Sequence, residues 1–370
     1  MNRFLITFTL LVPLAPWTMA GADLTADSVR GEQVFQALAC VQCHSVNGKG
    51  GTLAPDLGRG IDRNFRPASL AATMWNHAPT MWAAMRQQNV QGGDLNEQAA
   101  ADLFAYFYSA HFFDQPGDAG RGKHLFESKH CADCHGLTQP KLAEAKPVSQ
   151  WASIGDPIDL ADVMWNHAAT MRQQFARQRF HWSELTSQDL ADILVYLRNL
   201  PSERSAGSAV IISSGTAGQE LFQSKGCAAC HTGKLDLSLL LKSKTLTDIA
   251  AAMWDHEPRM AKSPPQISDD EMRQILSYLW AGQFFRDEGN PNAGARVFTV
   301  KHCASCHNDA SSGAPKLTGF GGSFTAASMV SALWHHGPRM LDQMKANNVA
   351  WPRFGGAEMA NLIAYLNSRK

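Results

Sequence analysis

The chain has 370 residues, with 33 Lys and Arg against 33 Asp and Glu, and therefore no formal net charge. Proteins that bind nucleic acid through its phosphates normally carry a basic excess, so the balanced charge argues against a nucleic-acid partner. Hydrophobic residues make up 45% of the sequence, and Gly and Pro number 29 and 17. These values are typical of a soluble globular protein and not of a fibrous or disordered one.

The N-terminal segment predicts export from the cytoplasm. It begins with a basic residue, Arg3, continues with an apolar run over 4–17, and ends with small residues at the positions that a signal peptidase reads. A retained membrane anchor is the alternative, but a span needs about 20 apolar residues, and this run is shorter and contains two prolines. No later segment is long and apolar enough to cross a membrane. We therefore expect residues 1–20 to be a cleaved signal peptide and the mature chain to be periplasmic, without a membrane span.

The eight cysteines form four pairs, each with the spacing Cys-x-x-Cys and each followed directly by histidine. They are Cys40, Cys43 and His44; Cys131, Cys134 and His135; Cys227, Cys230 and His231; and Cys303, Cys306 and His307. This is the attachment signature of haem c, because two thiols can add to the vinyl groups on one edge of the porphyrin while the adjacent histidine reaches the iron. The sequence therefore predicts four covalent haem c groups with iron, and the four histidines as proximal ligands.

Other uses of the cysteine pairs explain the pattern less well. Disulfides or redox dithiols would leave the histidine without a role in all four copies. A zinc site would require two pairs to come together, again with no part for that histidine.

The similarity between the four segments extends beyond the haem motif. Nine residues before the first cysteine lies a glycine, and five residues before it lies a phenylalanine: Gly31, Gly122, Gly218 and Gly294, and Phe35, Phe126, Phe222 and Phe298. We expect a short helix to lead into each motif, with the phenylalanine packed inward. A second helical segment follows, and an amphipathic third closes each copy over 98–108, 187–197, 268–279 and 356–366. No comparable strand pattern appears, so the predicted fold class is all-α.

Segments rich in Gly, Pro, Asp, Asn and Ser separate the copies. After the signal peptide (1–20), the expected domains, named units 1 to 4 below, are 21–115, 116–204, 205–286 and 287–370. The stretch 202–214 is the most linker-like, and we expect it to separate the chain into two pairs of domains.

On these residues the sequence resembles a tandem of class I c-type cytochrome domains over essentially all of residues 21–370. The matching features are the Gly-x-x-x-Phe lead-in, Cys-x-x-Cys-His, and a closing helix with an aromatic residue such as Tyr365. The resemblance implies four small all-α domains, each wrapped around one covalent haem and carrying electrons. It also implies that a proline after the motif places its carbonyl against the proximal histidine. Pro55, Pro140 and Pro315 could do so, and unit 3 has no such proline.

The distal iron ligand departs from the family pattern, in which a methionine usually comes from the loop before the last helix. That loop contains no methionine here. Two candidates recur in every unit, four residues apart and so on one helix face. They are Met81, Met171, Met260 and Met340, and, four residues earlier, His77, His167, His256 and His336.

Two arguments favour methionine, with histidine as the alternative. Prolines at 79, 258 and 338 predict that the helix bends or ends just after the histidine, which would bring the methionine toward the haem. The family places an aromatic residue of this helix against the haem. If Trp75, Trp165, Trp254 and Trp334 take that place, the histidine two residues later would point away. Six histidines that do not recur in all units are expected to be surface residues: His111, His124, His130, His181, His302 and His335.

An iron with two strong protein ligands has no open position for a substrate and transfers electrons at a distance. The sequence therefore predicts a periplasmic tetrahaem electron carrier, with no catalytic residues, that serves redox protein partners or a membrane respiratory complex. The alternative is a haem enzyme, peroxidase-like or a small-anion oxidoreductase, in which one unit has an open haem. Unit 3 is the place to look for it, because it lacks the proline and because Asp255 and Glu257 flank His256.

Overall fold

The computed structural model describes residues 25–58, 66–110, 117–151, 154–200, 211–213, 216–241, 244–260, 264–282, 289–317 and 324–369. Over these ranges the chain is helical apart from one short antiparallel hairpin, β1 (Ser45–Val46) with β2 (Lys49–Gly50). The expected all-α class is confirmed. The expected signal peptide and the expected boundaries near 115, 204 and 286 lie outside the described residues. None of the described helices is long and apolar enough to cross a membrane.

Each unit repeats one order of elements: a lead-in helix, a tight helical turn at the haem motif, a long helix and a closing helix. Unit 1 comprises α1 (Ser28–Ala37), η1 (Cys40–Gln42), α2 (Pro67–Gln87) and α3 (Glu97–Ala110). Unit 2 comprises α4 (Ala119–Ser128), α5 (Cys131–Cys134), η2 (Val148–Gln150), α6 (Pro157–Gln178) and α7 (Ser187–Arg198). Unit 3 comprises α8 (Thr216–Ser224), η3 (Cys227–Ala229), η4 (Gly233–Leu235), α9 (Leu237–Leu240), α10 (Leu246–His256), η5 (Glu257–Arg259) and α11 (Asp269–Ala281). Unit 4 comprises α12 (Pro291–Val300), α13 (Ala304–His307), η7 (Ala310–Ser312), α14 (Ala326–Ala346) and α15 (Gly356–Ser368).

In every unit the lead-in helix crosses the closing helix at the recurring glycine. A Cβ atom on this glycine would lie 1.9–2.1 Å from a backbone oxygen of the closing helix. It would also lie 2.6–2.8 Å from the Cβ of a tyrosine that recurs on that helix, which is Tyr106, Tyr196, Tyr278 or Tyr365. The four glycines are Gly31, Gly122, Gly218 and Gly294. No other residue fits where two backbones approach this closely, so the glycine in the repeat marks a helix crossing.

The recurring phenylalanine of the lead-in helix packs beside this helix crossing. As expected, it packs inward: Phe35, Phe126 and Phe298 are at most 3% exposed, and Phe222 is half-buried. Each ring lies 5.4–6.0 Å from the ring of the recurring tyrosine, which is within the range of favourable aromatic contacts.

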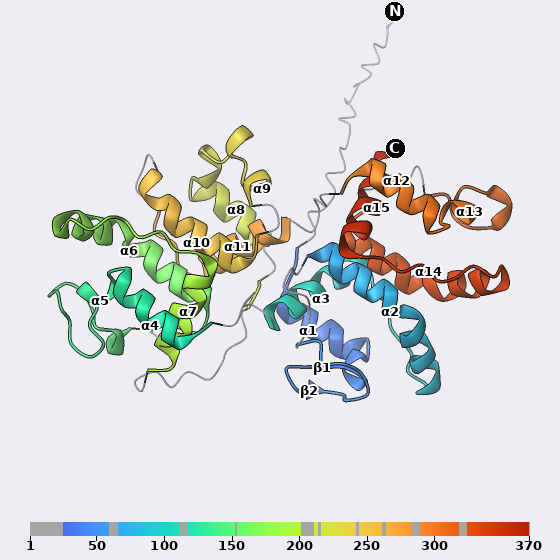
Figure 1. Ribbon diagram of the computed structural model, residues 1–370, viewed down its shortest axis with the longest axis horizontal. Coiled ribbons are helices and arrows are strands. Elements are labelled where there is room, and N and C mark those ends of the chain that lie inside the picture. The colour runs from blue at the N-terminus through green and yellow to red at the C-terminus, as the bar shows by residue number, and fades with distance from the viewer. Residues whose placement is uncertain are drawn as a thin grey trace, which may run out of the picture.

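The units do not pair in chain order. Figure 1 shows the helices of units 1 and 4 together in one half of the molecule and those of units 2 and 3 in the other. Helix α2 packs on α14 and α15, and α6 packs on α10 and α11. The segment 202–214 therefore does not divide the chain into pairs of consecutive domains. One of its residues, Ile212, is fully buried and exchanges backbone and side-chain hydrogen bonds with Ser28 of unit 1.

The same asparagine contact holds both pairs together. In units 1 and 4, Asn76 donates from Nδ2 to the carbonyl oxygen of Phe354 (2.8 Å) and accepts from its backbone N–H (2.8 Å). In units 2 and 3, Asn166 donates to the carbonyl oxygen of Ile267 (2.6 Å) and accepts from its N–H (3.0 Å). An asparagine side chain can complete both bonds at once, because its amide carries a donor and an acceptor.

In the partner units, the residues at the position of this asparagine make contacts in the opposite direction. The Asp255 carboxylate of unit 3 accepts from the backbone N–H of Leu185 in unit 2 (2.8 Å). His335 of unit 4 lies with Nε2 2.6 Å from the Asp94 carboxylate of unit 1. Each pair is thus nearly isologous, with the same patch used on both sides, as in a two-fold dimer.

The two halves also touch each other. The buried Tyr108 at the end of α3 in unit 1 accepts a hydrogen bond from the backbone N–H of Leu246 in unit 3 (2.8 Å). Its ring lies 4.5 Å from that of Trp280 on α11. Unit 3 therefore packs on unit 2 with one side and on unit 1 with another.

The prolines in the long helices act differently from the expectation. Helices α2 and α14 continue through Pro79 and Pro338, and only α10 ends at the histidine, before Pro258. Unit 2 has no proline there, yet the backbone of His167 itself leaves the helical region (φ −126°, ψ 15°). A helix tolerates an internal proline when the carbonyl four residues earlier finds another donor.

Candidate haem-binding sites

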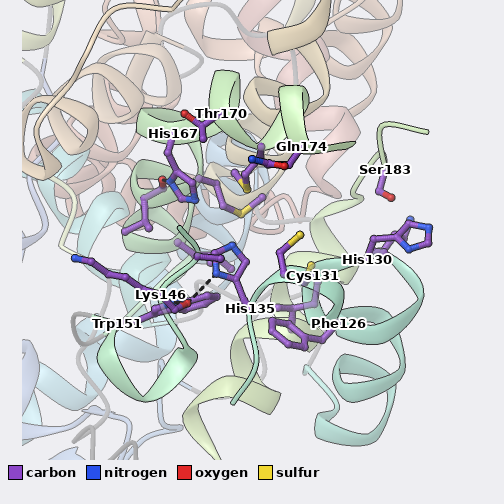
Figure 2. A pocket seen from close by; sticks show the side chains of 18 of the residues that line it. Phe126, His130, Cys131, His135, Lys146, Trp151, His167, Thr170, Gln174 and Ser183 are labelled. Atoms are coloured by element: carbon purple, nitrogen blue, oxygen red, sulfur yellow. Dashed lines mark hydrogen bonds between the residues drawn. The ribbon is translucent and has the colours of Figure 1, made fainter. Parts of the chain in front are cut away.

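A cavity of about 560 Å³ lies in unit 2 among the haem motif, α6 and α7. Cys131, Cys134 and His135 line one side of it and His167 another, and its remaining walls are largely apolar (Figure 2). This volume lies within the range of pockets that hold cofactors. The structure therefore brings the expected attachment residues of unit 2 together around a space of suitable size.

The proximal histidines are all oriented in the same way. In each unit Nδ1 lies 2.8–3.2 Å from a backbone carbonyl oxygen, and because a carbonyl only accepts, Nδ1 carries the proton and Nε2 is left free for a metal. The pairs are His44 with Pro55, His135 with Lys146, His231 with Leu235, and His307 with Pro315.

The expectation about the accepting carbonyl is thus confirmed for two prolines and wrong for one. Pro55 and Pro315 take this part, whereas in unit 2 Lys146 takes it in place of Pro140. Lys146 follows its histidine by 11 residues, as Pro55 does. In unit 3 the short η4 turn supplies Leu235, only four residues after the histidine.

The cysteines have the environment of attachment sites and not that of redox dithiols. All eight are free of disulfides. Burial raises the pKa of Cys40 and of Cys303 to about 11 and that of Cys131 to about 12. A redox Cys-x-x-Cys works through a thiolate whose pKa is lowered, so the raised values argue against that chemistry.

A left-handed residue directly before the first cysteine sets up each motif. It is Ala39, His130, Gly226 or His302, with φ between 59° and 81°. This residue breaks the chain direction after the lead-in helix and starts the turn that carries both cysteines. Only in unit 3 is it a glycine, the residue that adopts this conformation at no steric cost.

The candidate distal histidine faces the proximal histidine in three units. The ring centres are 5.9 Å apart for His44 and His77, 6.2 Å for His135 and His167, and 5.6 Å for His231 and His256. Figure 2 shows the His167 ring across the cavity from that of His135.

A hydrogen bond and a lowered pKa both suit His167 to bind a metal. Its Nδ1 donates to the carbonyl oxygen of Val163, so Nε2 keeps its lone pair. Burial, together with the facing His135, lowers the pKa of His167 below its ordinary value. Imidazole binds metal in this neutral form.

Three of the four tryptophans turn to the partner unit and not to their own haem site, so the expectation was wrong for these three. The indole Nε1 atoms of Trp165, Trp254 and Trp334 each donate to a backbone carbonyl in the closing loop of the partner unit (2.8–3.0 Å). Residues two apart on a helix point in directions roughly 200° apart. In units 2 and 3 the tryptophan turns to the partner unit, and the histidine two residues later turns to the proximal histidine of its own unit.

Of the four methionine candidates, the structure places Met171 at a haem cavity. Met171 lines the unit 2 cavity together with His167. Met81 packs beside the interface cluster around Trp82 and Leu333, and Met260 borders the main core.

The features that singled out unit 3 belong to its interface with unit 2. Asp255 bonds to Leu185, and Glu257 is 1% exposed with Arg172 of α6 at 3.8 Å. Among the histidines expected at the surface, His130 instead lines the unit 2 cavity and stacks on Phe180, with ring centres 3.9 Å apart. His111 lies outside the described residues.

The donor set fits covalently bound haem. Paired thiols, a preset proximal imidazole, a facing side chain and an apolar cavity are what haem c requires. Two buried indole nitrogens, those of Trp75 and Trp182, have no hydrogen-bond partner among the described residues. A haem propionate is an acceptor that could satisfy such a donor.

Comparison with known proteins agrees with this geometry. The Cytochrome c family model matches residues 28–110, 119–201 and 291–370, more than half of the chain. A segment of 87 residues is 33% identical to a subunit of nitric oxide reductase from Stutzerimonas stutzeri, covering 22% of this chain and 57% of that relative. No solved structure matches the chain. The chain belongs to the cytochrome c family and is a multi-domain c-type cytochrome that transfers electrons through haem.

Proposed function

We propose that this chain is an exported electron carrier with four haem c groups, one in each unit. The family match leaves out unit 3 entirely. Unit 3 nevertheless has Cys227, Cys230 and His231, the glycine crossing at Gly218 and a histidine facing the proximal one. Each bound haem iron would take up and release one electron. Mass spectrometry of the purified protein, with a haem assay, is expected to give four haems per chain, and a count of three would remove unit 3 from the proposal.

We propose His77, His167, His256 and His336 as the distal ligands. A bond between an imidazole nitrogen and a metal ion is roughly 2 Å long, so two imidazoles on one metal have ring centres about 6 Å apart. The measured separations of 5.6–6.2 Å in units 1 to 3 agree with that value. This agreement is the observation that carries the assignment. It also leaves no open position on the iron in these units, which favours a carrier over an enzyme.

Methionine remains the second candidate, because Met171 lines the same cavity as His167. Two variants separate the ligands. His167→Ala is expected to turn one of the haems high-spin, whereas Met171→Ala leaves all of them low-spin. The opposite result, or a methionine charge-transfer band in the oxidised wild-type protein, would assign methionine instead. A high-spin haem in the untouched protein that binds carbon monoxide would support the enzyme alternative.

Export and a redox partner complete the proposal. The segment 1–20 has the pattern of a signal peptide, and we propose a periplasmic location. The curated relative is a subunit of nitric oxide reductase. We therefore propose redox proteins or a membrane respiratory complex as partners. Fractionation of cells that express the full chain is expected to recover haem-loaded protein without residues 1–20 in the periplasm, and recovery in the membrane fraction with an intact N-terminus would indicate an anchor.

A further inference from the structure

One tryptophan of unit 3 forms part of the haem site of unit 2. Trp254 lies on α10 of unit 3, two residues before His256, and is 8% exposed. The same side chain forms part of the wall of the unit 2 cavity, with Ser183 and Leu185 beside it. Figure 2 shows Ser183 at the edge of that cavity, and Trp254 Nε1 donates to its carbonyl oxygen (2.8 Å).

Unit 2 supplies a second indole that completes the contact. Trp182, in the loop before α7, stacks on Trp254 with ring centres 4.0 Å apart and planes 25° apart. Phe175 also lines the unit 2 cavity, and its ring centre lies 5.5 Å from that of Trp182. Packed aromatic rings therefore connect the wall of the unit 2 cavity with helix α10, which carries the candidate distal histidine of unit 3.

Units 1 and 4 contain the corresponding arrangement. Trp75, two residues before His77, stacks on Trp351 of the unit 4 loop with ring centres 5.3 Å apart and planes 23° apart. Trp82 packs edge-on against the same ring at 5.7 Å. Its indole also lies against Gly337, where a Cβ would come within 2.2 Å of it. Gly337 directly follows His336, so the cluster contacts α14 next to the candidate distal histidine of unit 4.

We propose that these tryptophan contacts join the haem sites into two electron-sharing pairs, unit 2 with unit 3 and unit 1 with unit 4. The inference rests on the proposed electron-transfer function. One electron leaves the ferrous iron of one site, which becomes ferric, and reduces the ferric iron of the other, and no proton or atom moves. Tunnelling weakens steeply across unfilled space, and the indoles supply packed atoms between the sites without being oxidised themselves.

The proposal joins units 2 and 3, which are consecutive in the chain, and units 1 and 4, which lie at its two ends. Units 1 and 2 follow each other in sequence, as do units 3 and 4, yet the aromatic contacts connect 2 with 3 and 1 with 4. Exchange is thus expected to be faster within these spatial pairs than between units 1 and 2 or between units 3 and 4.

Substitutions at Trp254 test the pair in the four-haem protein. The readout is the rate of electron exchange between sites, from exchange spectra of haem methyl protons in a partly reduced sample. Trp254→Leu removes the ring and leaves a cavity, and is expected to slow exchange between units 2 and 3 about tenfold or more. Trp254→Phe keeps a ring in place but loses the bond to Ser183, and its rate is expected to stay within about threefold of wild type, because a smaller cavity remains.

Trp280→Leu is the matched control. It removes another buried indole from unit 3, on the side that faces Tyr108 of unit 1, and exchange between units 2 and 3 is expected to remain at the wild-type rate. Equal rates for Trp254→Leu and wild type overturn the proposal. So does an equal slowing by Trp280→Leu, which would show a general loosening of unit 3. If Trp254→Leu does not load haem, Trp182→Leu and Trp182→Phe make the same comparison from the unit 2 side.

A redox titration keeps this inference separate from the function on which it rests. Reversible uptake of four electrons supports the carrier function even if substitution of Trp254 does not change the exchange rate. In that case only the proposed pairing of haem sites is refuted. A protein that does not take up and release electrons reversibly fails the proposed function itself.

Discussion

The carbonyl oxygen of Trp75 accepts a hydrogen bond from the indole Nε1 of Trp351, 3.0 Å away in the partner unit. In an uninterrupted helix this carbonyl would accept from the backbone N–H four residues later, but that residue is Pro79, which has none. The proline therefore does not end the helix. It frees a backbone acceptor that unit 4 uses to dock on unit 1.

Trp351→Phe is expected to destabilise the holoprotein by about 1–3 kcal/mol, because a largely buried carbonyl loses its partner. The change is measured by denaturant unfolding. Pro79→Ala supplies the control, because an alanine at this position has a backbone N–H that can donate to the carbonyl oxygen of Trp75. In that background Trp351→Phe should cost clearly less. Equal costs in both backgrounds would show that the bond to Trp75 does not matter.

The glycine crossing gives a second expectation. Gly122→Ala places a Cβ 2.0 Å from the carbonyl oxygen of Asp192, so α4 must move away from α7. The expected cost is about 3 kcal/mol, at the upper end for overpacking, with a lower haem content of the purified protein. Gly120→Ala, two residues away on the same helix, meets only the tip of the Asp118 side chain at 3.2 Å. It should be neutral or stabilising by up to about 1 kcal/mol. A Gly122→Ala protein as stable as the Gly120→Ala protein would contradict the close crossing.

The sequence alone predicts the local elements of this protein well. Gly31, Phe35 and their equivalents, the cysteine pairs and the amphipathic closing segments depend on contacts within one unit, and these contacts recur four times. The repeat therefore identifies the all-α fold, the haem motif and the proximal histidine.

The sequence does not predict how the units pair, because that depends on which surfaces meet after folding. Trp254 and its equivalents recur with the same spacing as the haem residues, so nothing in the pattern separates an interface role from a haem role. Trp182 and Trp351 lie in the loops before the closing helices of units 2 and 4. The corresponding loops of units 1 and 3 contain no tryptophan. Their function becomes visible only when the partner unit is in place.

The paired asparagines allow the two interfaces to be tested separately. Asn166→Asp replaces the Nδ2 donor with a carboxylate oxygen opposite the carbonyl oxygen of Ile267 and beside Asp162, with an expected cost of about 3 kcal/mol. Asn76→Asp should have a similar effect on units 1 and 4 through Phe354. Because the two sites share no partner, the costs in the double variant should add to within about 0.5 kcal/mol in denaturant unfolding. Strong non-additivity would mean that the two pairs unfold as one interface.

Asp162 makes the stability of the 2–3 pair depend on pH. Burial, and then the charge of Asp269, raise the pKa of this carboxyl to about 6, although Asn166 donates a hydrogen bond to it. A folded-state pKa above the unfolded value means that the protonated form stabilises the fold and that this contribution is lost as the pH rises through about 6. Asp162→Asn keeps an acceptor for Asn166 but carries no charge. We therefore expect it to raise the melting temperature at pH 8 and to leave it nearly unchanged at pH 4, where the wild-type carboxyl is already largely protonated. A variant with the same shift at both pH values would show that ionisation of Asp162 does not set the difference.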